Sequence, residues 1–150
     1  MIQESKIYFD LESLNILANN FSFKLKKGSI VFLKGELGAG KTTFARMLIN
    51  NLYEINKLTK PNSIKSPSFP ILLTYDLVSF EIFHYDLYRI KNNLELNELN
   101  IEEQLNNSIT LIEWPEIILQ REFNYKFYLI ELIIHNENKR IVNITLMNNC

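Results

Sequence analysis

The sequence predicts an α/β fold, in which helices flank a mixed β-sheet and the chain ends in an antiparallel hairpin. Three observations support this prediction. Short apolar runs, such as residues 29–34 and 109–114, have the length of buried strands. Residues 10–21 repeat apolar side chains at helical spacing, as an amphipathic helix does. Near the end of the chain, two alternating segments surround residues 136–139, which is typical of a hairpin.

The composition indicates one globular domain over residues 1–150. Hydrophobic residues make up 47% of the chain and charged residues 22%, enough apolar material to bury a core. A net charge of −1 gives no basic surface for direct nucleic-acid binding. The single cysteine, Cys150, excludes an internal disulfide framework, so we expect a cytoplasmic location. No signal peptide or apolar run of about 20 residues is present, so we expect no membrane association.

The first half of the chain alternates helix and strand. Asp10 is positioned to cap the helix over residues 10–21. A buried strand follows over residues 29–34, and a second amphipathic helix is expected over residues 41–52. Residues 53–66 lose apolar periodicity, which predicts a loop.

The second half continues with strands and short helices. Residues 71–77 and 80–86 are expected to form two strands joined by a turn. Residues 93–107 hold one or two short helices, with Asn100 as a left-handed break. A buried strand over residues 109–114 then precedes the C-terminal hairpin.

A glycine-rich loop lies between the first predicted strand and the second helix. Residues 35–42, "GELGAGKT", contain three of the chain's four glycines and fit the phosphate-binding pattern G-x-x-x-x-G-K-[ST]. Glycines let successive backbone N–H groups point at phosphate oxygens, and the helix N-terminus adds partial positive charge. A simple glycine turn is the alternative, but it would not need the Lys-Thr pair.

The pattern assigns roles to the loop residues. Lys41 can reach the β- and γ-phosphates, and the Thr42 hydroxyl can bind Mg²⁺. The fold is therefore expected to be P-loop NTPase-like, with nucleotide bound by Gly35, Gly38, Ala39, Gly40, Lys41, Thr42 and Thr43. A GTPase is disfavoured because residues 56–59, "NKLT", lack the aspartate that reads guanine. A small-molecule kinase is disfavoured because the chain has four arginines and no insert long enough for a lid.

Three further strings accompany the loop: "SPSF" at residues 66–69, "HYDLYR" at 84–89 and "LIEWPE" at 111–116. In this order and spacing the chain resembles the TsaE (YjeE) family from about residue 10 to the "RIVNI" at 140–144. Members are small bacterial ATPases required for making threonylcarbamoyladenosine in tRNA. The resemblance implies the cofactors ATP and Mg²⁺, the partners TsaB and TsaD, and contact with tRNA only through that complex.

Two of the strings supply candidate site residues before the resemblance is considered. Ser68 offers a hydroxyl after the loop and helix, where phosphate-sensing segments often lie; a simple turn is the alternative. Strand alternation places His84 and Asp86 on one face. Asp86 is a candidate for Mg²⁺ or its waters, and the resemblance makes it a site residue, whereas we interpret His84 as structural.

The third string places an acid at the end of an apolar strand. By resemblance Glu113 would bind or orient Mg²⁺, or polarise the attacking water; a strand-end capping acid is the alternative. Trp114 is either a core anchor or a contact beside the nucleotide. Arg140 is a nucleotide contact only by the family's placement. We thus expect Lys41, Asp86 and Glu113 to be catalytic, and Thr42, Asp86 and Glu113 to hold the metal.

The sequence therefore predicts an ATP-binding and hydrolysing subunit, weak alone and activated by partners. Two alternatives stay open. ATP binding alone could promote assembly without useful hydrolysis, or the chain could phosphorylate a small molecule. The sequence also departs from the family, which usually has aspartate at Glu36 and threonine at Ser68.

Overall fold

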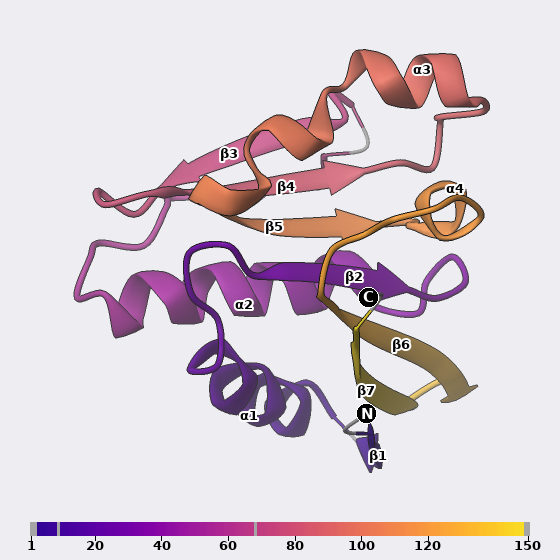
Figure 1. Cartoon of the computed structure of the whole chain (residues 1–150). Helices are drawn as coiled ribbons and strands as arrows, with labels where there is room; N and C mark the ends of the chain where they lie inside the picture. Colours follow the sequence, from indigo (N-terminus) through magenta and orange to yellow (C-terminus); the bar gives the residue numbers. More distant parts are fainter. Residues whose placement is uncertain (1–2, 9, 68, 149–150) are drawn as a thin grey trace.

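A seven-stranded mixed sheet with helices on both faces forms the core of the fold (Figure 1). The computed structural model describes residues 3–8, 10–67 and 69–148. The sheet order is β1-β7-β6-β2-β5-β4-β3. The strands, in chain order, are β1 Gln3–Tyr8, β2 Ile30–Lys34, β3 Leu72–Asp76, β4 Glu81–Asp86, β5 Ser108–Glu113, β6 Phe127–Asn136 and β7 Lys139–Met147.

The four central strands, β6, β2, β5 and β4, run parallel to one another. Their carboxyl ends therefore meet at one edge of the sheet, where α/β folds commonly bind ligands. In the β4–β5 pair, Asp86 lies opposite Glu113. In the β2–β5 pair, Leu33 lies opposite Glu113, so the loop after β2 begins beside that acid. The strand pairing thus brings three separate sequence motifs to one edge.

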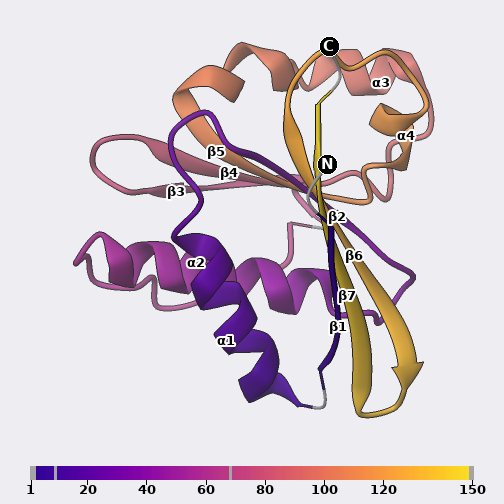
Figure 2. The same ribbon diagram turned by 60° about the horizontal axis from the view of Figure 1, so that its bottom comes forward.

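Helices α1 (Leu11–Ser22) and α2 (Lys41–Ile55) cover one face of the sheet. Figure 2 shows the two helices side by side on that face. The Asp10 side chain accepts a hydrogen bond of 2.8 Å from the Ser13 amide, which confirms the predicted cap of α1. Buried side chains of α2, including Phe44 and Leu48, join strand residues such as Leu111 in one apolar cluster.

Shorter helices cover the opposite face (Figure 1). They are α3 (Asn93–Glu98), η1 (Ile101–Glu103), η2 (Leu105–Asn107) and α4 (Glu116–Leu119). Asn100 has φ 49° and ψ 41°, which confirms the predicted left-handed break between α3 and η1. Leu96, Leu105 and Phe32 belong to the second apolar cluster, so this face also excludes water from the sheet.

The predicted α/β class, mixed sheet and C-terminal hairpin are confirmed, with β6 and β7 paired antiparallel. The predicted end of the second helix was wrong: α2 continues to Ile55, and only then does the irregular segment begin. Tyr53 explains the extension because it packs into the first apolar cluster.

Two elements, β1 and α4, were not predicted from the sequence. The "QESKIY" sequence of β1 shows little strand alternation, and the strand forms because the edge of β7 supplies its backbone partners. Helix α4 spans only four residues, too few to show a helical period. Among the described residues, no helix is long and apolar enough to cross a membrane.

Candidate functional site

The glycine loop, defined here as residues 35–40, connects the end of β2 to the start of α2. Gly38 and Gly40 have φ values of 80° and 105°, which side chains oppose. A Cβ added at either position would meet no atom within 4 Å, so backbone conformation, not crowding, requires glycine there. Gly35 is different, since its added Cβ would lie 2.6 Å from the Leu132 carbonyl oxygen. The loop thus needs glycine at Gly38 and Gly40 for backbone conformation and at Gly35 for close packing.

Lys41 points back under the loop that precedes it. Its Nζ donates to the carbonyl oxygens of Gly35 and Glu36 at 2.7 and 2.9 Å, and lies 3.9 Å from the centre of the Trp114 ring. Only 5% of the residue is exposed. Burial lowers the pKa of Lys41, while the nearby carboxylate of Glu113 acts in the opposite direction. A cation is therefore held in place beside the loop.

A chain of hydrogen bonds joins α2, β5 and β4. The Thr42 hydroxyl donates to Oε1 of Glu113 at 2.6 Å. The other carboxylate oxygen, Oε2, lies 2.7 Å from His84 Nε2. Glu113 and His84 are 1% and 0% exposed, so the carboxylate is held from both sides in a site shielded from water. The interpretation of His84 as merely structural is thus incomplete, because its ring contacts a candidate site residue directly.

Asp86 lies beside this group at the end of β4. Asp86 is 5% exposed, and its Oδ1 accepts a hydrogen bond of 2.9 Å from the Tyr88 amide. That bond fixes the carboxylate over the first turn after the strand. The structure therefore brings Lys41, Thr42, Asp86 and Glu113 to one edge, from three separate motifs.

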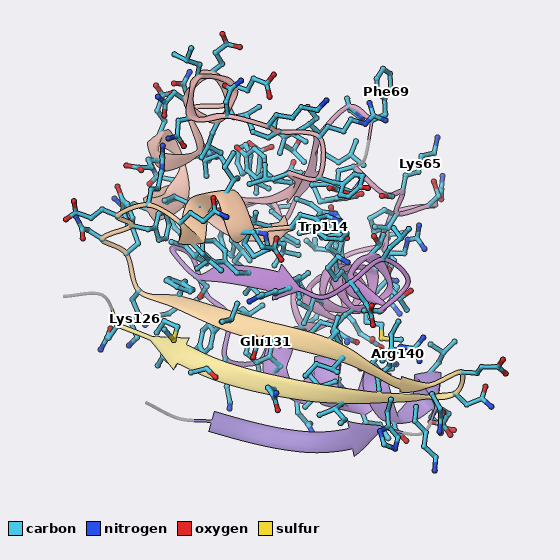
Figure 3. The ribbon with its side chains drawn as sticks, turned by 90° about the vertical axis from the view of Figure 1, so that its right-hand side faces the viewer. Lys65, Phe69, Trp114, Lys126, Glu131 and Arg140 are labelled. Atoms are coloured by element: carbon cyan, nitrogen blue, oxygen red, sulfur yellow. The ribbon has the colours of Figure 1, made fainter. Side chains whose placement is uncertain are left out.

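Trp114 shows features of both interpretations that the sequence left open. Its ring is half-buried against the second apolar cluster and lies 4.8 Å from the Tyr88 ring centre. It also faces the Lys41 ammonium. The residue has φ 57°, an uncommon conformation for a bulky side chain, and one that occurs often at functional sites. In Figure 3, Trp114 lies between the end of β5 and α2.

Arg140 reaches the glycine loop from the opposite side, at the start of β7 (Figure 3). Its Nε donates to the Ala39 carbonyl at 3.1 Å, and a terminal nitrogen donates to the Gly38 carbonyl at 3.2 Å. The other terminal nitrogen donates to the Asn136 carbonyl at 2.8 Å, within the hairpin. The guanidinium therefore links the hairpin to the outer carbonyls of the loop. No local sequence pattern predicts this link, because it joins residues 101 and 102 positions apart.

A cleft of about 730 Å³ opens next to the loop. Its walls come from the start of α1, the glycine loop and the β6–β7 turn, and include Leu11, Leu14, Gly38, Thr43, Asn138 and Arg140. Thr43, predicted to bind nucleotide, lines this cleft. Ser68, the remaining predicted site residue, lies outside the described residues. Its neighbour Phe69 is 80% exposed, with the Arg89 guanidinium 4.5 Å from its ring centre.

The donors at this edge fit a magnesium ion that is only partly bound by protein. Mg²⁺ prefers oxygen ligands and usually keeps waters or substrate phosphates among them. Thr42, Glu113 and Asp86 supply oxygens of that kind. No group of three or more histidine, cysteine or acidic residues arranged for a metal occurs in residues 3–8, 10–67 and 69–148. A complete protein cage is thus missing from that part of the chain.

The sequence matches a known protein family over most of its length. The family model described as "Threonylcarbamoyl adenosine biosynthesis protein TsaE" matches residues 9–142. The chain belongs to the TsaE family. The TsaE protein of Rickettsia bellii is 39% identical over 97% of this chain and 96% of its own. That of Rickettsia felis is 41% identical over 89% of this chain and 74% of its own.

A solved structure supports the fold. The crystal structure of Bacillus subtilis YdiB matches with a TM-score of 0.72, covering 99% of this chain and 88% of that one. The two sequences are 21% identical, so this likeness establishes the fold alone. The predicted resemblance to the TsaE family is confirmed by the family model and the curated relatives together.

We expect Arg140→Lys to loosen the glycine loop of this TsaE-family chain while leaving the fold intact. Lysine keeps the charge but cannot span two loop carbonyls and the hairpin with one planar group. Amide hydrogen exchange at Gly38, Ala39 and Gly40 should quicken by roughly tenfold, the loss of about 1.4 kcal/mol of local stability.

The matched control for this measurement is Arg121→Lys. Arg121 donates to Asn97 on the face of the sheet that α3 and α4 cover, and among the described residues it makes no hydrogen bond to the loop. Equal exchange rates in the Arg140 variant and the wild type would show that the guanidinium does not support the loop.

Proposed function

We propose that this chain is a Mg²⁺-dependent ATPase that acts in the biosynthesis of threonylcarbamoyladenosine in tRNA. The observation that carries the proposal is the arrangement of the buried Lys41 and Glu113 with the half-buried Thr42 beside the glycine loop. The pathway follows from membership of the TsaE family, whose relatives carry that biosynthetic name. ATP hydrolysis is inferred from the chemistry of the site.

The phosphates of ATP would lie against the loop amides and the N-terminus of α2. Gly38 and Gly40 provide the backbone angles for that cradle, and the helix end adds partial positive charge. Lys41 would exchange two loop carbonyls for phosphate oxygens. The charge-assisted bonds to phosphate would replace the two bonds that Nζ now donates to the Gly35 and Glu36 carbonyls. The adenosine would extend into the adjacent cleft between α1 and the hairpin.

Thr42, Glu113 and Asp86 would hold the metal. The Thr42 hydroxyl already donates its proton to Glu113, so its lone pairs are directed elsewhere and are available to a cation. The carboxylates of Glu113 and Asp86 would orient the metal's waters or bind it directly. Bound Mg²⁺ would neutralise charge that develops on the phosphates during transfer. Glu113 could instead polarise the attacking water, since it lies in the same shielded site.

The partners and the location are part of the same proposal, and the family resemblance and the net charge support them. We propose that the chain acts on a complex of TsaB and TsaD in the cytoplasm. The net charge of −1 favours contact with tRNA through those partners rather than a direct grip. A nucleotide-dependent assembly switch without useful hydrolysis is the second candidate. One observation favours this candidate. The sequence context of the four arginines identifies none of them as an arginine finger, the residue that would stabilise the transition state of hydrolysis.

Lys41→Ala should weaken Mg·ATP binding at least roughly 30-fold. Losing one partner of a buried charge pair costs about 2–5 kcal/mol. Calorimetric titration would measure the affinity, with Lys34→Ala as the matched control. Lys34 lies at the end of β2, pairs loosely with Glu131 at 3.9 Å and is 43% exposed, so its removal should leave affinity unchanged. Wild-type affinity in the Lys41 variant would reject the phosphate-site assignment.

Glu113→Gln should retain ATP binding and lose hydrolysis by roughly 100-fold or more. The amide keeps the side-chain shape but removes the charge that metal or water requires. Binding would be measured by calorimetry and turnover by phosphate release. Unchanged turnover would make Glu113 a structural acid at the end of β5.

The isolated chain should hydrolyse ATP slowly, and addition of TsaB and TsaD should raise its turnover. A partner could supply a cation that stabilises the charge of the transition state. Phosphate release at saturating Mg·ATP, with and without the partners, checks this. If the partners bind and the rate stays the same, the assembly switch becomes the better account. Phosphate appearing on an added metabolite would indicate a kinase.

A further inference from the structure

We propose that His84 is a positioning residue that sets the orientation of the Glu113 carboxylate toward Thr42 and Mg²⁺. This inference rests on the proposed function, because it assigns His84 a part in the same metal site. Its basis is the contact of 2.7 Å between His84 Nε2 and Glu113 Oε2, made where both side chains are almost wholly buried.

The two nitrogens of the ring have different surroundings. Nε2 faces the carboxylate, whereas Nδ1 is buried and has no hydrogen-bond partner among the described residues. A proton on Nδ1 would leave a buried donor unsatisfied, which costs about 1–3 kcal/mol. The hydrogen-bond network therefore places the ring proton on Nε2, where it is donated to Glu113.

The donated bond restricts how Glu113 can turn. A carboxylate rotates readily about its last bond, since that torsion has broad minima. His84 binds one oxygen and Thr42 binds the other, so the plane of the group is fixed from two sides. His84 comes from β4 and Thr42 from α2, two elements that the sheet and the first apolar cluster hold rigidly. Glu113 is thereby kept ready for the metal before nucleotide arrives.

The position of His84 in the sheet supports this role over simple packing. Along the same face of β4, the preceding inward residue Ile82 joins the first apolar cluster, and the following one, Asp86, is a site acid. His84 lies between the apolar core and the site. A core position filled only for packing would be better occupied by an apolar side chain, because a buried unpartnered nitrogen is unfavourable.

The test compares His84→Gln with His84→Leu. Glutamine carries an N–H donor the same number of bonds from Cα as Nε2, whereas leucine has similar bulk and no donor. The affinity for ADP is measured by calorimetry at increasing Mg²⁺ concentrations. The quantity compared is the Mg²⁺ concentration at which half of the increase in affinity is reached. We expect leucine to raise that concentration by roughly tenfold or more, as for loss of one charge-assisted hydrogen bond, and glutamine to stay within about threefold of wild type.

The control is Ile82→Val, which removes a buried methylene from the same face of β4 without touching Glu113. It should lower the unfolding temperature and leave the Mg²⁺ dependence of ADP binding unchanged. If lost stability alone could change the Mg²⁺ dependence, this variant would change it too. Equal effects of glutamine and leucine, or no shift with leucine, would overturn the proposal.

A readout without nucleotide covers the case in which His84→Leu does not fold. Long-range ¹H–¹⁵N spectra of the wild type should show His84 protonated at Nε2 and unprotonated at Nδ1. The other histidine, His135, is exposed on β6 and serves as the reference. A proton on Nδ1 instead would overturn the proposal. Failure of the wild type to bind nucleotide in a Mg²⁺-dependent manner would instead refute the proposed function, and His84 would lose its role with it.

Discussion

The hydrogen bond between Thr42 and Glu113 depends on the parallel pairing of β2 with β5, and the rest of the site is arranged around it. That pairing sets the start of α2 beside the end of β5, so a hydroxyl from one motif meets a carboxylate from another 71 residues later. The β4–β5 pair then adds Asp86 directly opposite Glu113. A shift of β5 by one residue against its neighbours would turn Glu113 to the other face.

Burial gives these contacts their strength. The two apolar clusters cover both faces of the central strands and exclude water from the strand ends. Charges and hydrogen bonds in such a setting interact more strongly than in water, and unpaired ones cost more. Glu113 therefore has a donor on each oxygen, and Lys41 has two carbonyls and an aromatic face. These contacts hold the polar side chains of the candidate site in place without a ligand.

Much of the site could be predicted because its residues lie in short local patterns. The glycine loop, the acid that ends β5 and the aspartate that ends β4 each stand out in a few residues of sequence. Arg140 and His84 did not show their contacts, because each bonds a residue distant in the chain. Strand β1 was missed for a related reason, since its pairing comes from β7 and its own sequence is mostly polar. Sequence patterns predict local structure well and contacts between distant elements poorly.

The position of Lys41 with nucleotide bound tests the central claim most directly. The claim is that the loop holds the phosphates of ATP and that Lys41 moves from the loop to those phosphates. A crystal structure with Mg²⁺ and a non-hydrolysable ATP analogue should show Nζ within hydrogen-bond distance of β- or γ-phosphate oxygens, and no longer on the Gly35 and Glu36 carbonyls. Nucleotide bound elsewhere, with Nζ still on both carbonyls, would contradict the account.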